Sequence, residues 1–337
     1  MNAPTERAAF LAERKQGLGG SDIAAALGYS KYKTPVALWM EKTGQSDDDI
    51  DSMRMRFGNH NEEFVAREYC EVTGLKVQRF NPMLRHRDHP HVIGHVDRLV
   101  VPRGAKVAAH RGEIRTDRGL EAKTVDGHVY RYSGEWGEPG TDEIPTYYLI
   151  QCVTYMALTG CQYWDLAALI GSGSAPLAIY PLQRDAELED EILRRAEEWW
   201  KRHVIGGEAP APTNEADIDL LYPQAAKRDP ITAEEYIESA IRRLAKVKRI
   251  SRRLEQYEGD LKSTIKAYMQ SAGTLLDADG NKLATWNNRK GRTTFDLDGF
   301  VGHLCPGAMP DERAEFIADA KRSFTTRGPD GRTFLIK

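Results

Sequence analysis

The chain has 337 residues, of which 41% are hydrophobic and 29% are charged, and this is the composition of an ordinary folded protein with room for one large domain and an appended one. The formal net charge of −3 excludes a uniformly basic DNA-binding protein, so any attraction for phosphates has to be local. Because the sequence has no signal peptide and no apolar run that could span a bilayer, we expect a cytoplasmic protein with no membrane partner.

The first predicted element is a short helix over Asp22–Leu27, with Ser21 as its N-cap and Gly28 behind it. Gly19 and Gly20 precede this helix and leave backbone N–H groups able to face an anion. Arg14 carries a guanidinium fork that suits a phosphate. A capped helix after a flexible turn is the alternative interpretation of the same residues.

Two further helices are predicted over Pro35–Lys42 and Asn61–Val72. The inner side of the second helix is expected to hold Phe64, Val65 and Tyr69. We place Glu62 in its first turn, near the positive end of the helix dipole. There it is either an ordinary helix cap or an acid delivered to a metal site.

Strands are predicted over Leu75–Arg79, His91–Val100 and Gly119–Val125. Glu121 and Lys123 are two positions apart on a strand, so their side chains are expected on the same face. Asp97 on a neighbouring strand can then share a divalent metal with Glu121, while Lys123 orients or deprotonates a water. An Asp followed by Glu-x-Lys is the constellation of the PD-(D/E)xK nucleases, although an exposed charge pair gives the same pattern.

Four histidines lie close together in the sequence: His86, His89, His91 and His95. A zinc site is conceivable, but the spacings match no common template. His95 is two residues before Asp97, so it is expected to share its face. It could touch a metal, a water or a phosphate, or take a supporting or DNA-facing role.

The four cysteines show no C-x-x-C spacing, which argues against zinc and against an iron–sulfur cluster. We expect them to be reduced packing residues. They are Cys70, Cys152, Cys161 and Cys305.

A helix over Tyr147–Leu158 begins after a proline and ends at a glycine. Gln151 is a polar residue in this mostly apolar helix, and it either satisfies a core hydrogen bond or faces an active site. Two strands and a helix complete the core, over Tyr163–Leu169, Ala178–Pro181 and Ala186–His203. Together the elements predict an α/β fold with a central mixed sheet flanked by helices.

The composition changes after residue 205, which predicts a core over 1–205, a linker over 206–230 and a C-terminal region over 231–337. The C-terminal region is expected to contain a long amphipathic helix, Thr232–Ser271, and a hairpin, Leu275–Trp286, around an Asp-Gly turn. Seven basic residues of the helix are either a phosphate-contact face, a partner surface or a solvated side: Arg242, Arg243, Lys246, Lys248, Arg249, Arg252 and Arg253.

In order and spacing, these motifs resemble the YqaJ-type viral recombinase family, which includes the phage lambda exonuclease and belongs to the PD-(D/E)xK nuclease superfamily. The motifs are Gly-x-Gly-Gly-Ser-Asp from Gly17, Gly-x-x-x-Glu from Gly58, Asp97, Glu-x-Lys from Glu121, and Gln-x-x-x-Tyr-Met-x-x-Thr-Gly from Gln151. The resemblance covers roughly residues 10–200. An insertion over Pro102–Arg118 departs from the family pattern.

The resemblance implies roles for individual residues. It makes Asp97, Glu121, Glu62 and the Ala122 backbone carbonyl ligands of Mg²⁺ or Mn²⁺, with two ions per active site. It makes Lys123 the group that activates water and places Gln151 beside the nucleophile. It assigns the pocket for a 5′-terminal phosphate to Arg14, Gly19, Gly20 and Ser21.

The function expected from this resemblance is 5′→3′ degradation of one strand of linear double-stranded DNA. The remaining 3′ single-stranded tail would serve phage-type recombination by strand annealing. The implied partners are DNA ends, a single-strand annealing protein and two further copies of the chain in a trimer, in a bacterial cell that carries the phage or prophage. An endonuclease of the same superfamily and a non-catalytic DNA-binding or annealing protein are the alternatives.

Overall fold

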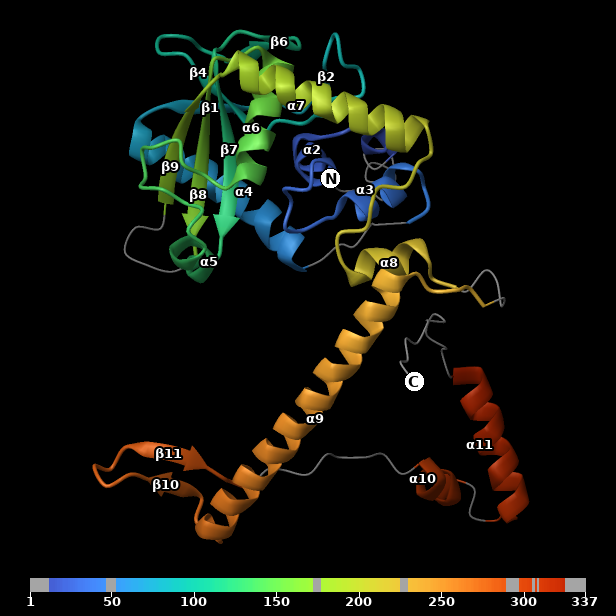
Figure 1. Ribbon diagram of the computed structural model, residues 1–337. Coiled ribbons are helices and arrows are strands. Elements are labelled where there is room, and N and C mark those ends of the chain that lie inside the picture. Colours follow the sequence, from blue (N-terminus) through green and yellow to red (C-terminus); the bar gives the residue numbers. More distant parts are fainter. Residues whose placement is uncertain are drawn as a thin grey trace. The chain divides into compact units, whose positions relative to one another are not determined.

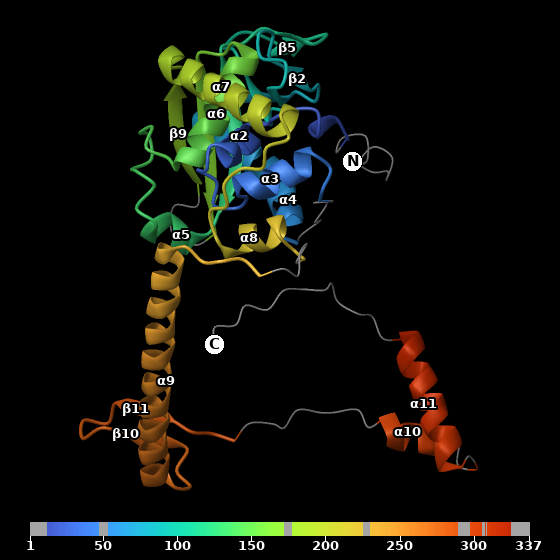
Figure 2. The same ribbon diagram turned by 45° about the vertical axis from the view of Figure 1, so that its right-hand side comes forward.

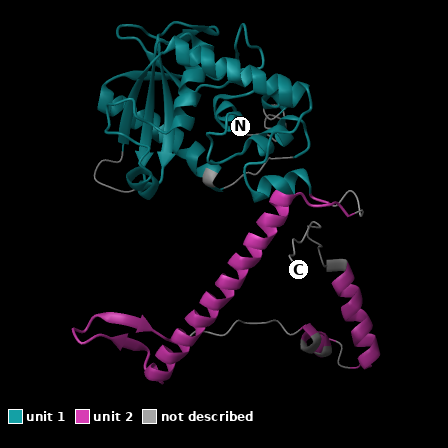
Figure 3. Ribbon diagram, in the orientation of Figure 1, with its two compact units in different colours: residues 1–222 teal, residues 223–337 magenta. Residues whose placement is uncertain are grey.

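The computed structural model describes residues 12–46, 53–171, 177–224, 230–288, 297–304, 307 and 309–324. The chain divides into two compact units, Met1–Tyr222 and Pro223–Lys337, which Figure 3 colours separately. The division falls inside the stretch expected to be a linker. That stretch also contains a short helix, α8 (Glu215–Leu221).

The first unit carries most of the predicted elements (Figure 1). Its helices are α2 (Gly20–Ala26), α3 (Pro35–Lys42), α4 (Met53–Thr73), α5 (Gly127–Tyr132), α6 (Thr146–Thr159), α7 (Ala186–Trp199), the π-helix η1 (Trp200–Ile205) and α8. Its strands are β1 (Lys76–Arg79), β2 (Leu84–Arg85), β3 (Ile93–Gly94), β4 (Arg98–Val101), β5 (Ala109–His110), β6 (Glu113–Ile114), β7 (Arg118–Val125), β8 (Tyr163–Ile170) and β9 (Leu177–Gln183).

Five of the strands form a mixed sheet in the order β1-β4-β7-β8-β9. The β7–β8 pair is parallel and the other three pairs are antiparallel. The sequence insertion forms a small separate hairpin of β5 and β6, so it leaves the pairing of β4 with β7 intact. The predicted α/β core with a central mixed sheet is confirmed.

Helices cover both faces of this sheet (Figures 1 and 2). Alternate side chains of β7 point to opposite faces. Leu120 and Ala122 pack with Val65 and Tyr69 of α4, whereas Val125 joins the larger core on the other face. Helices α2, α6 and α7 contribute to that larger core. Glu121 and Lys123 alternate with Leu120 and Ala122, and so they belong to the face that α6 covers.

The helix α6 matches its prediction because its ends are encoded locally. Pro145 precedes the first turn, and Gly160 ends the helix in the left-handed conformation at φ 75°, which a glycine adopts without strain. Tyr148, Gln151 and Tyr155 are all buried along one side of the helix. A polar glutamine is therefore held inside the protein rather than at its surface.

Two predictions about helix starts were wrong. Helix α2 begins at Gly20 with Gly19 as N-cap, and Ser21 lies inside its first turn, because the Asp22 carboxylate accepts a hydrogen bond from the Gly19 N–H at 3.1 Å. Helix α4 begins at Met53, so Glu62 lies in its middle and away from the positive end of the dipole. The prediction that Phe64 lies on the inner side of this helix was also wrong, since the residue is 41% exposed.

The strand predicted over His91–Val100 is broken into β3 and β4, with residues 95–97 outside both. The alternation argument that placed His95 and Asp97 on one face therefore does not apply. The break matters for function, because Asp97 comes immediately before β4 and is not held by the strand ladder.

Gly119 is a position where the sheet has no room for a side chain. A Cβ atom there would lie 2.2 Å from the Trp164 ring, which is fully buried. We expect Gly119→Ala to lower the free energy of unfolding by about 2–3 kcal/mol, since overpacking forces a buried ring to move. Gly58→Ala is the matched control: a Cβ atom added at this position in α4 would meet nothing within 4 Å, so stability should be unchanged or slightly higher. Equal denaturant midpoints for the two variants would contradict this account of Gly119.

The second unit contains the long helix α9 (Glu235–Met269), the hairpin of β10 (Thr274–Leu276) and β11 (Lys282–Thr285), and the helices α10 (Leu297–Leu304) and α11 (Pro310–Phe324). The predicted long helix and hairpin are confirmed. None of the helices in the described part of either unit combines the length and apolar character needed to cross a bilayer.

Candidate active site and phosphate pocket

The candidate active site lies where β4 stops pairing with β7. The described pairing joins Arg98 to Leu120 and Leu99 to Gly119, and β7 continues beyond it to Val125. A backbone N–H at the edge of a sheet needs a partner. The Asp97 carboxylate supplies one by accepting a hydrogen bond from the Ala122 N–H at 3.0 Å. This bond brings Asp97 beside the strand that carries Glu121.

Glu121 and Lys123 lie on the same face of β7, as their spacing predicts, and their charged groups form an ion pair. Glu121 is only 1% exposed. The Gln151 amide of α6 donates a hydrogen bond to Glu121 Oε1 at 2.7 Å and another to the Tyr155 hydroxyl at 3.0 Å. The Lys123 ammonium also lies 5.4 Å from the centre of the Tyr148 ring. The polar glutamine of α6 therefore faces the acidic site.

Burial and the neighbouring Asp97 carboxylate together raise the pKa of Glu121 to about 8, against the opposing effect of Lys123. Burial opposes the charge on Lys123, but Glu121 and Asp97 outweigh it and raise the pKa of the lysine. Glu121 Oε2 is buried with no hydrogen-bond partner. Two carboxylates thus meet in a buried place where a proton or a cation has to reduce their repulsion.

Glu62 reaches the same place from α4. Burial and the Asp97 charge raise its pKa, although Arg98 opposes them. The Arg98 guanidinium contacts Glu62 and also donates to Glu63 Oε2 at 2.9 Å. Among the described residues, no group of three or more His, Cys, Asp or Glu side chains is gathered as a metal-binding cluster. Glu62 lies near the acid pair but is held by Arg98.

A second site lies next to α2. A cavity of about 150 Å³ is lined by Arg14, the turn of Gly19, Gly20 and Ser21, and His95, with Tyr155 of α6 at its wall. All four residues predicted for a phosphate pocket therefore meet around one cavity. His95 also lines it, and its Nδ1 atom lies 3.1 Å from the Asn81 carbonyl oxygen.

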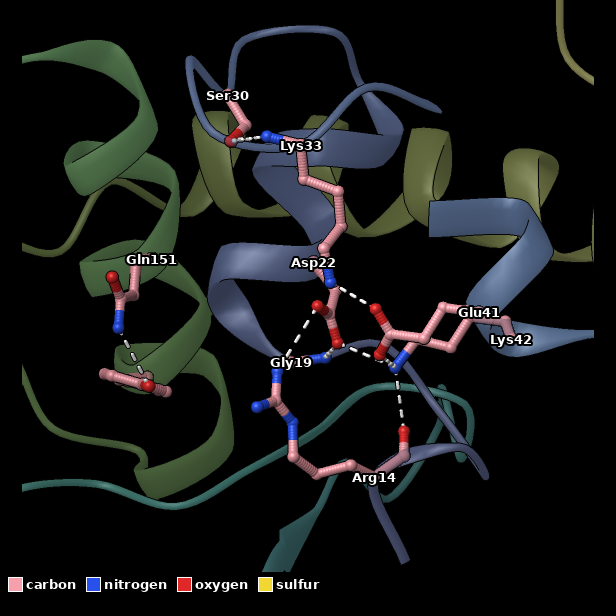
Figure 4. A network of polar contacts seen from close by, with 9 residues as sticks. Arg14, Gly19, Asp22, Ser30, Lys33, Glu41, Lys42 and Gln151 are labelled. Carbon is pink, nitrogen blue, oxygen red and sulfur yellow. Dashed lines mark hydrogen bonds and ion pairs between the residues drawn. The ribbon is translucent and has the colours of Figure 1, made fainter. Parts of the chain in front are cut away.

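A buried ion pair fixes the shape of this cavity (Figure 4). The Lys42 ammonium, whose side chain is fully buried, lies 2.8 Å from the Asp22 carboxylate and donates to the Arg14 carbonyl oxygen at 2.8 Å. The Arg14 guanidinium lies 3.5 Å from the other carboxylate oxygen. Burial opposes ionisation of Asp22, but Lys42, Arg14 and Lys33 outweigh it and lower its pKa.

The two sites are joined by the packing of α2 against α6. A Cβ atom at Gly20 would lie 2.9 Å from Gln151 Cγ, so only a glycine allows this approach. Gly20 lines the cavity, and Gln151 binds Glu121. The cavity and the acid pair consequently share a wall of closely packed atoms.

The other three histidines of the sequence cluster, His86, His89 and His91, do not line the cavity. His89 Nδ1 is 3.1 Å from a Glu197 carboxylate oxygen, and the His91 ring stacks on Trp200. Burial lowers the pKa of His91 to about 4, so this ring is neutral near pH 7. The cysteines Cys70, Cys152 and Cys161 are free thiols, as predicted, and Cys305 lies outside the described residues.

Three residues that organise these sites were missed in the sequence: Asp22, Lys42 and Arg98. Each is a charged side chain that is at most 7% exposed. Arg98 could have been suspected, because a charged residue that opens the apolar run Leu99-Val100-Val101 needs a buried partner. Nothing in the local pattern identifies Lys42, because its partners come from other segments of the chain.

A mixed sheet lies between helices, and an acid pair and a lysine lie beside the point where β4 stops pairing with β7, which is an arrangement that the Asp and Glu-x-Lys motif leads one to expect. Residues 9–162 match the family model of the YqaJ-like viral recombinase domain. Through this region the chain is similar to that family.

A relative from Bacillus subtilis (strain 168), the uncharacterized protein YqaJ, is 34% identical over 211 residues. The match covers 62% of this chain and spans 60% of the length of that relative.

Two solved structures are similar to part of this chain. The alkaline exonuclease LHK-Exo from Laribacter hongkongensis is 17% identical with a TM-score of 0.44, and the match covers 59% of this chain and 93% of that one. A phage-related exonuclease from Haemophilus somnus 129PT is 14% identical with a TM-score of 0.40, and the match covers 59% of this chain and all of that one, 100%.

Proposed function

We propose that this protein is a metal-dependent exonuclease that degrades one strand of linear double-stranded DNA in the 5′→3′ direction and leaves 3′ single-stranded tails. The observation that carries the proposal is the pair of half-buried Asp97 and buried Glu121, with Lys123 bound to Glu121 and a pKa of about 8 at Glu121. Perturbed pairs of this kind are unfavourable for folding and are typical of sites that do chemistry.

The residues fit a divalent cation. Glu121 Oε2 has no hydrogen-bond partner, and the two carboxylates repel each other unless a positive charge joins them. Oxygen ligands are those that Mg²⁺ and Mn²⁺ prefer. Asp97, Glu121, Glu62 and the Ala122 carbonyl would hold the metal, two ions per site, with Glu62 leaving Arg98 to do so. A bound divalent ion would polarise the scissile phosphate and acidify a water.

The protein's own groups would complete the chemistry. The Lys123 ammonium lies beside Glu121, where it would orient the attacking water for in-line displacement, and the proton that the water loses would pass to the solvent. Gln151 would hold Glu121 Oε1 in place through its 2.7 Å hydrogen bond and lie beside the nucleophile. The product would keep its phosphate on the 5′ end. His95 lines the neighbouring cavity, so a contact with the DNA backbone suits it better than a role among the acids.

The cavity beside α2 would receive the 5′-terminal phosphate. Arg14 presents a guanidinium, and Gly19, Gly20 and Ser21 line the same cavity. Asp22 lies behind Arg14 and partly offsets its charge, while Lys42 adds a second buried positive charge. Glu13 lies 3.9 Å from His95 at the same cavity, so the Arg14 guanidinium, rather than an overall positive charge, would favour a phosphate over a neutral end.

Incubation with linear duplex and with covalently closed circular plasmid, each with and without Mg²⁺ or Mn²⁺, tests the proposal. We expect loss of the linear duplex only when the metal is present, while the closed circle stays intact. Cutting of the circle would indicate an endonuclease. DNA binding without any cleavage would indicate a non-catalytic protein.

Arg14→Ala should remove the preference for 5′-phosphorylated over 5′-hydroxyl duplex ends while slow cleavage persists. The guanidinium lines the cavity, and a charge-assisted contact to a phosphate contributes roughly 1.5–3 kcal/mol, or about tenfold to 100-fold in the ratio of initial rates. Arg115→Ala is the control, because that arginine pairs with Glu113 in the β5–β6 hairpin and does not line the cavity. An Arg14→Ala ratio equal to that of the unmodified protein would mean that the pocket is misassigned.

The partners proposed with this function are double-stranded DNA ends, a single-strand annealing protein that receives the 3′ tail, and further copies of the chain in a trimer. Cross-linking the protein to a 5′-phosphorylated end would test the first of these. The mass of the pure protein in solution would test the last.

A further inference from the structure

Helix α9 carries an apolar side that the described residues of the second unit leave exposed. The helix has 35 residues, and its only buried residue is Met269, at the end where the β10–β11 hairpin packs (Figure 2). Leu244, the best covered of its other large apolar side chains, is 37% exposed, and Tyr268 is 77% exposed. Most helices owe their stability to packing of an apolar face, so a helix of this length calls for a partner.

The apolar residues of α9 repeat every 3.5 residues rather than every 3.6. In a seven-residue repeat written a to g, position a falls on Ile237, Leu244, Ser251, Glu258 and Ile265, and position d falls on Ala240, Val247, Leu254, Leu261 and Tyr268. Only Ser251 and Glu258 are polar at these positions. A strict seven-residue repeat keeps its apolar stripe in register with a second helix as the two wind around each other, and this defines a coiled coil.

We propose that α9 pairs with the same helix of a second copy of the chain, in antiparallel orientation, through a contact separate from the one that would form the trimer. The register that aligns the whole repeat places Ser251 against Leu254 of the second copy and Glu258 against Val247 of the second copy. At the flanking e positions, Lys248 then meets Glu255 of the second copy, and this attraction occurs twice. Charges at such positions determine which partner and which direction a coiled coil accepts.

The parallel orientation is opposed by the same charges. In register, it would place Glu258 directly against Glu258 of the second copy inside the seam, where like charges repel. It would also place Arg243 beside Lys248 of the second copy, again twice. The antiparallel pair has neither conflict, because the basic part of each helix lies along Glu255, Glu258 and Asp260 of the other.

The pairing leaves most of the basic stripe in solvent. Five of its seven residues occupy the outward positions b, c and f of the repeat: Arg242, Lys246, Arg249, Arg252 and Arg253. A paired α9 therefore keeps an exposed basic surface, so self-association does not require these charges to be buried.

Two matched variants of the full chain test the pairing by sedimentation equilibrium over a range of protein concentrations. Val247→Glu places a charge in the seam, whereas Ala245→Glu makes the same change at an outward position two residues away. We expect the first to raise the dissociation constant by about tenfold or more and the second to leave it within about twofold. Far-UV circular dichroism checks that both keep their helix content. A full chain that never self-associates, self-association that Val247→Glu leaves unchanged, or equal effects of the two changes, overturns the proposal.

Charge exchange tests the direction of the pair. Lys248→Glu and Glu255→Lys should each weaken association of the full chain, and the double variant should restore it to within about threefold. Stronger association of Lys248→Glu alone would indicate the parallel arrangement, since it would then face Arg243, and would overturn the proposal. Val247→Glu that weakens binding to a 5′-phosphorylated duplex without changing the mass would assign the surface to DNA instead.

Discussion

Lys123→Ala is expected to abolish cleavage of linear duplex DNA while metal-dependent DNA binding persists. The lysine forms an ion pair with buried Glu121, and its ammonium is the only described lysine group bound to the acid pair. Loss of a positioned donor that orients the nucleophile and stabilises negative charge costs about 10²- to 10³-fold in rate. The measurement is the single-turnover rate on a 5′-phosphorylated duplex in saturating Mg²⁺, with binding followed separately by fluorescence anisotropy.

The control for this experiment is Lys201→Ala in η1. That lysine also pairs with a glutamate, Glu197, but its side chain is 67% exposed. Removing a surface ion pair of this kind changes stability by less than about 1 kcal/mol and should leave the cleavage rate unchanged. Undiminished cleavage by Lys123→Ala would remove the assigned role of the lysine. Loss of both cleavage and binding would instead indicate that the site had collapsed.

Glu121→Gln is expected to abolish the pH dependence of metal binding. A carboxyl group must lose its proton before it holds a cation, so the affinity of the unmodified protein for Mn²⁺ should rise about tenfold per pH unit below the pKa of Glu121 and level off above it. That pKa is about 8. In the Gln variant we expect affinity lower by about 100-fold and nearly constant over this range. Calorimetric titration with Mn²⁺, without DNA, measures both effects.

The same group makes a prediction about stability without metal. The pKa of Glu121 is 4.5 in an unstructured chain and about 8 in the folded protein. Between these values the folded state binds more protons than the unfolded state, so the free energy of unfolding falls as the pH rises from 4.5 to about 8. In EDTA, Glu121→Gln should flatten this part of the curve. A Gln variant with the same pH profile as the unmodified protein would place the raised pKa elsewhere.

The sequence contained enough information to predict the sheet and the acid pair. Strand alternation places Glu121 and Lys123 together regardless of the rest of the fold, and the proline and glycine at its ends delimit α6. Glu62 was harder, because its helix starts at Met53 rather than near Asn61. Ser52, a suitable N-cap residue, directly precedes Met53 in the sequence, but Gly58 inside the segment lowers its helix propensity and hides this start.

Sequence patterns did not predict the partners of the buried charged residues. Lys42 binds Asp22 and Arg14, and these residues belong to separate turns that only the folded chain brings together. The heptad in α9 shows the opposite case. Its spacing is visible in the sequence, but the exposed side chains of the folded helix are what make it a surface in need of a partner.

The contact between Gly20 and Gln151 fixes a distance between the two sites. This distance runs from the cavity that would bind the terminal phosphate to the acid pair where the strand would be cleaved. Because Gly20 has no side chain at this point, the distance between the phosphate cavity and the acid pair is set by closely packed atoms rather than by a hinge. An enzyme built in this way would release fragments of one size from every substrate, however long or short the duplex.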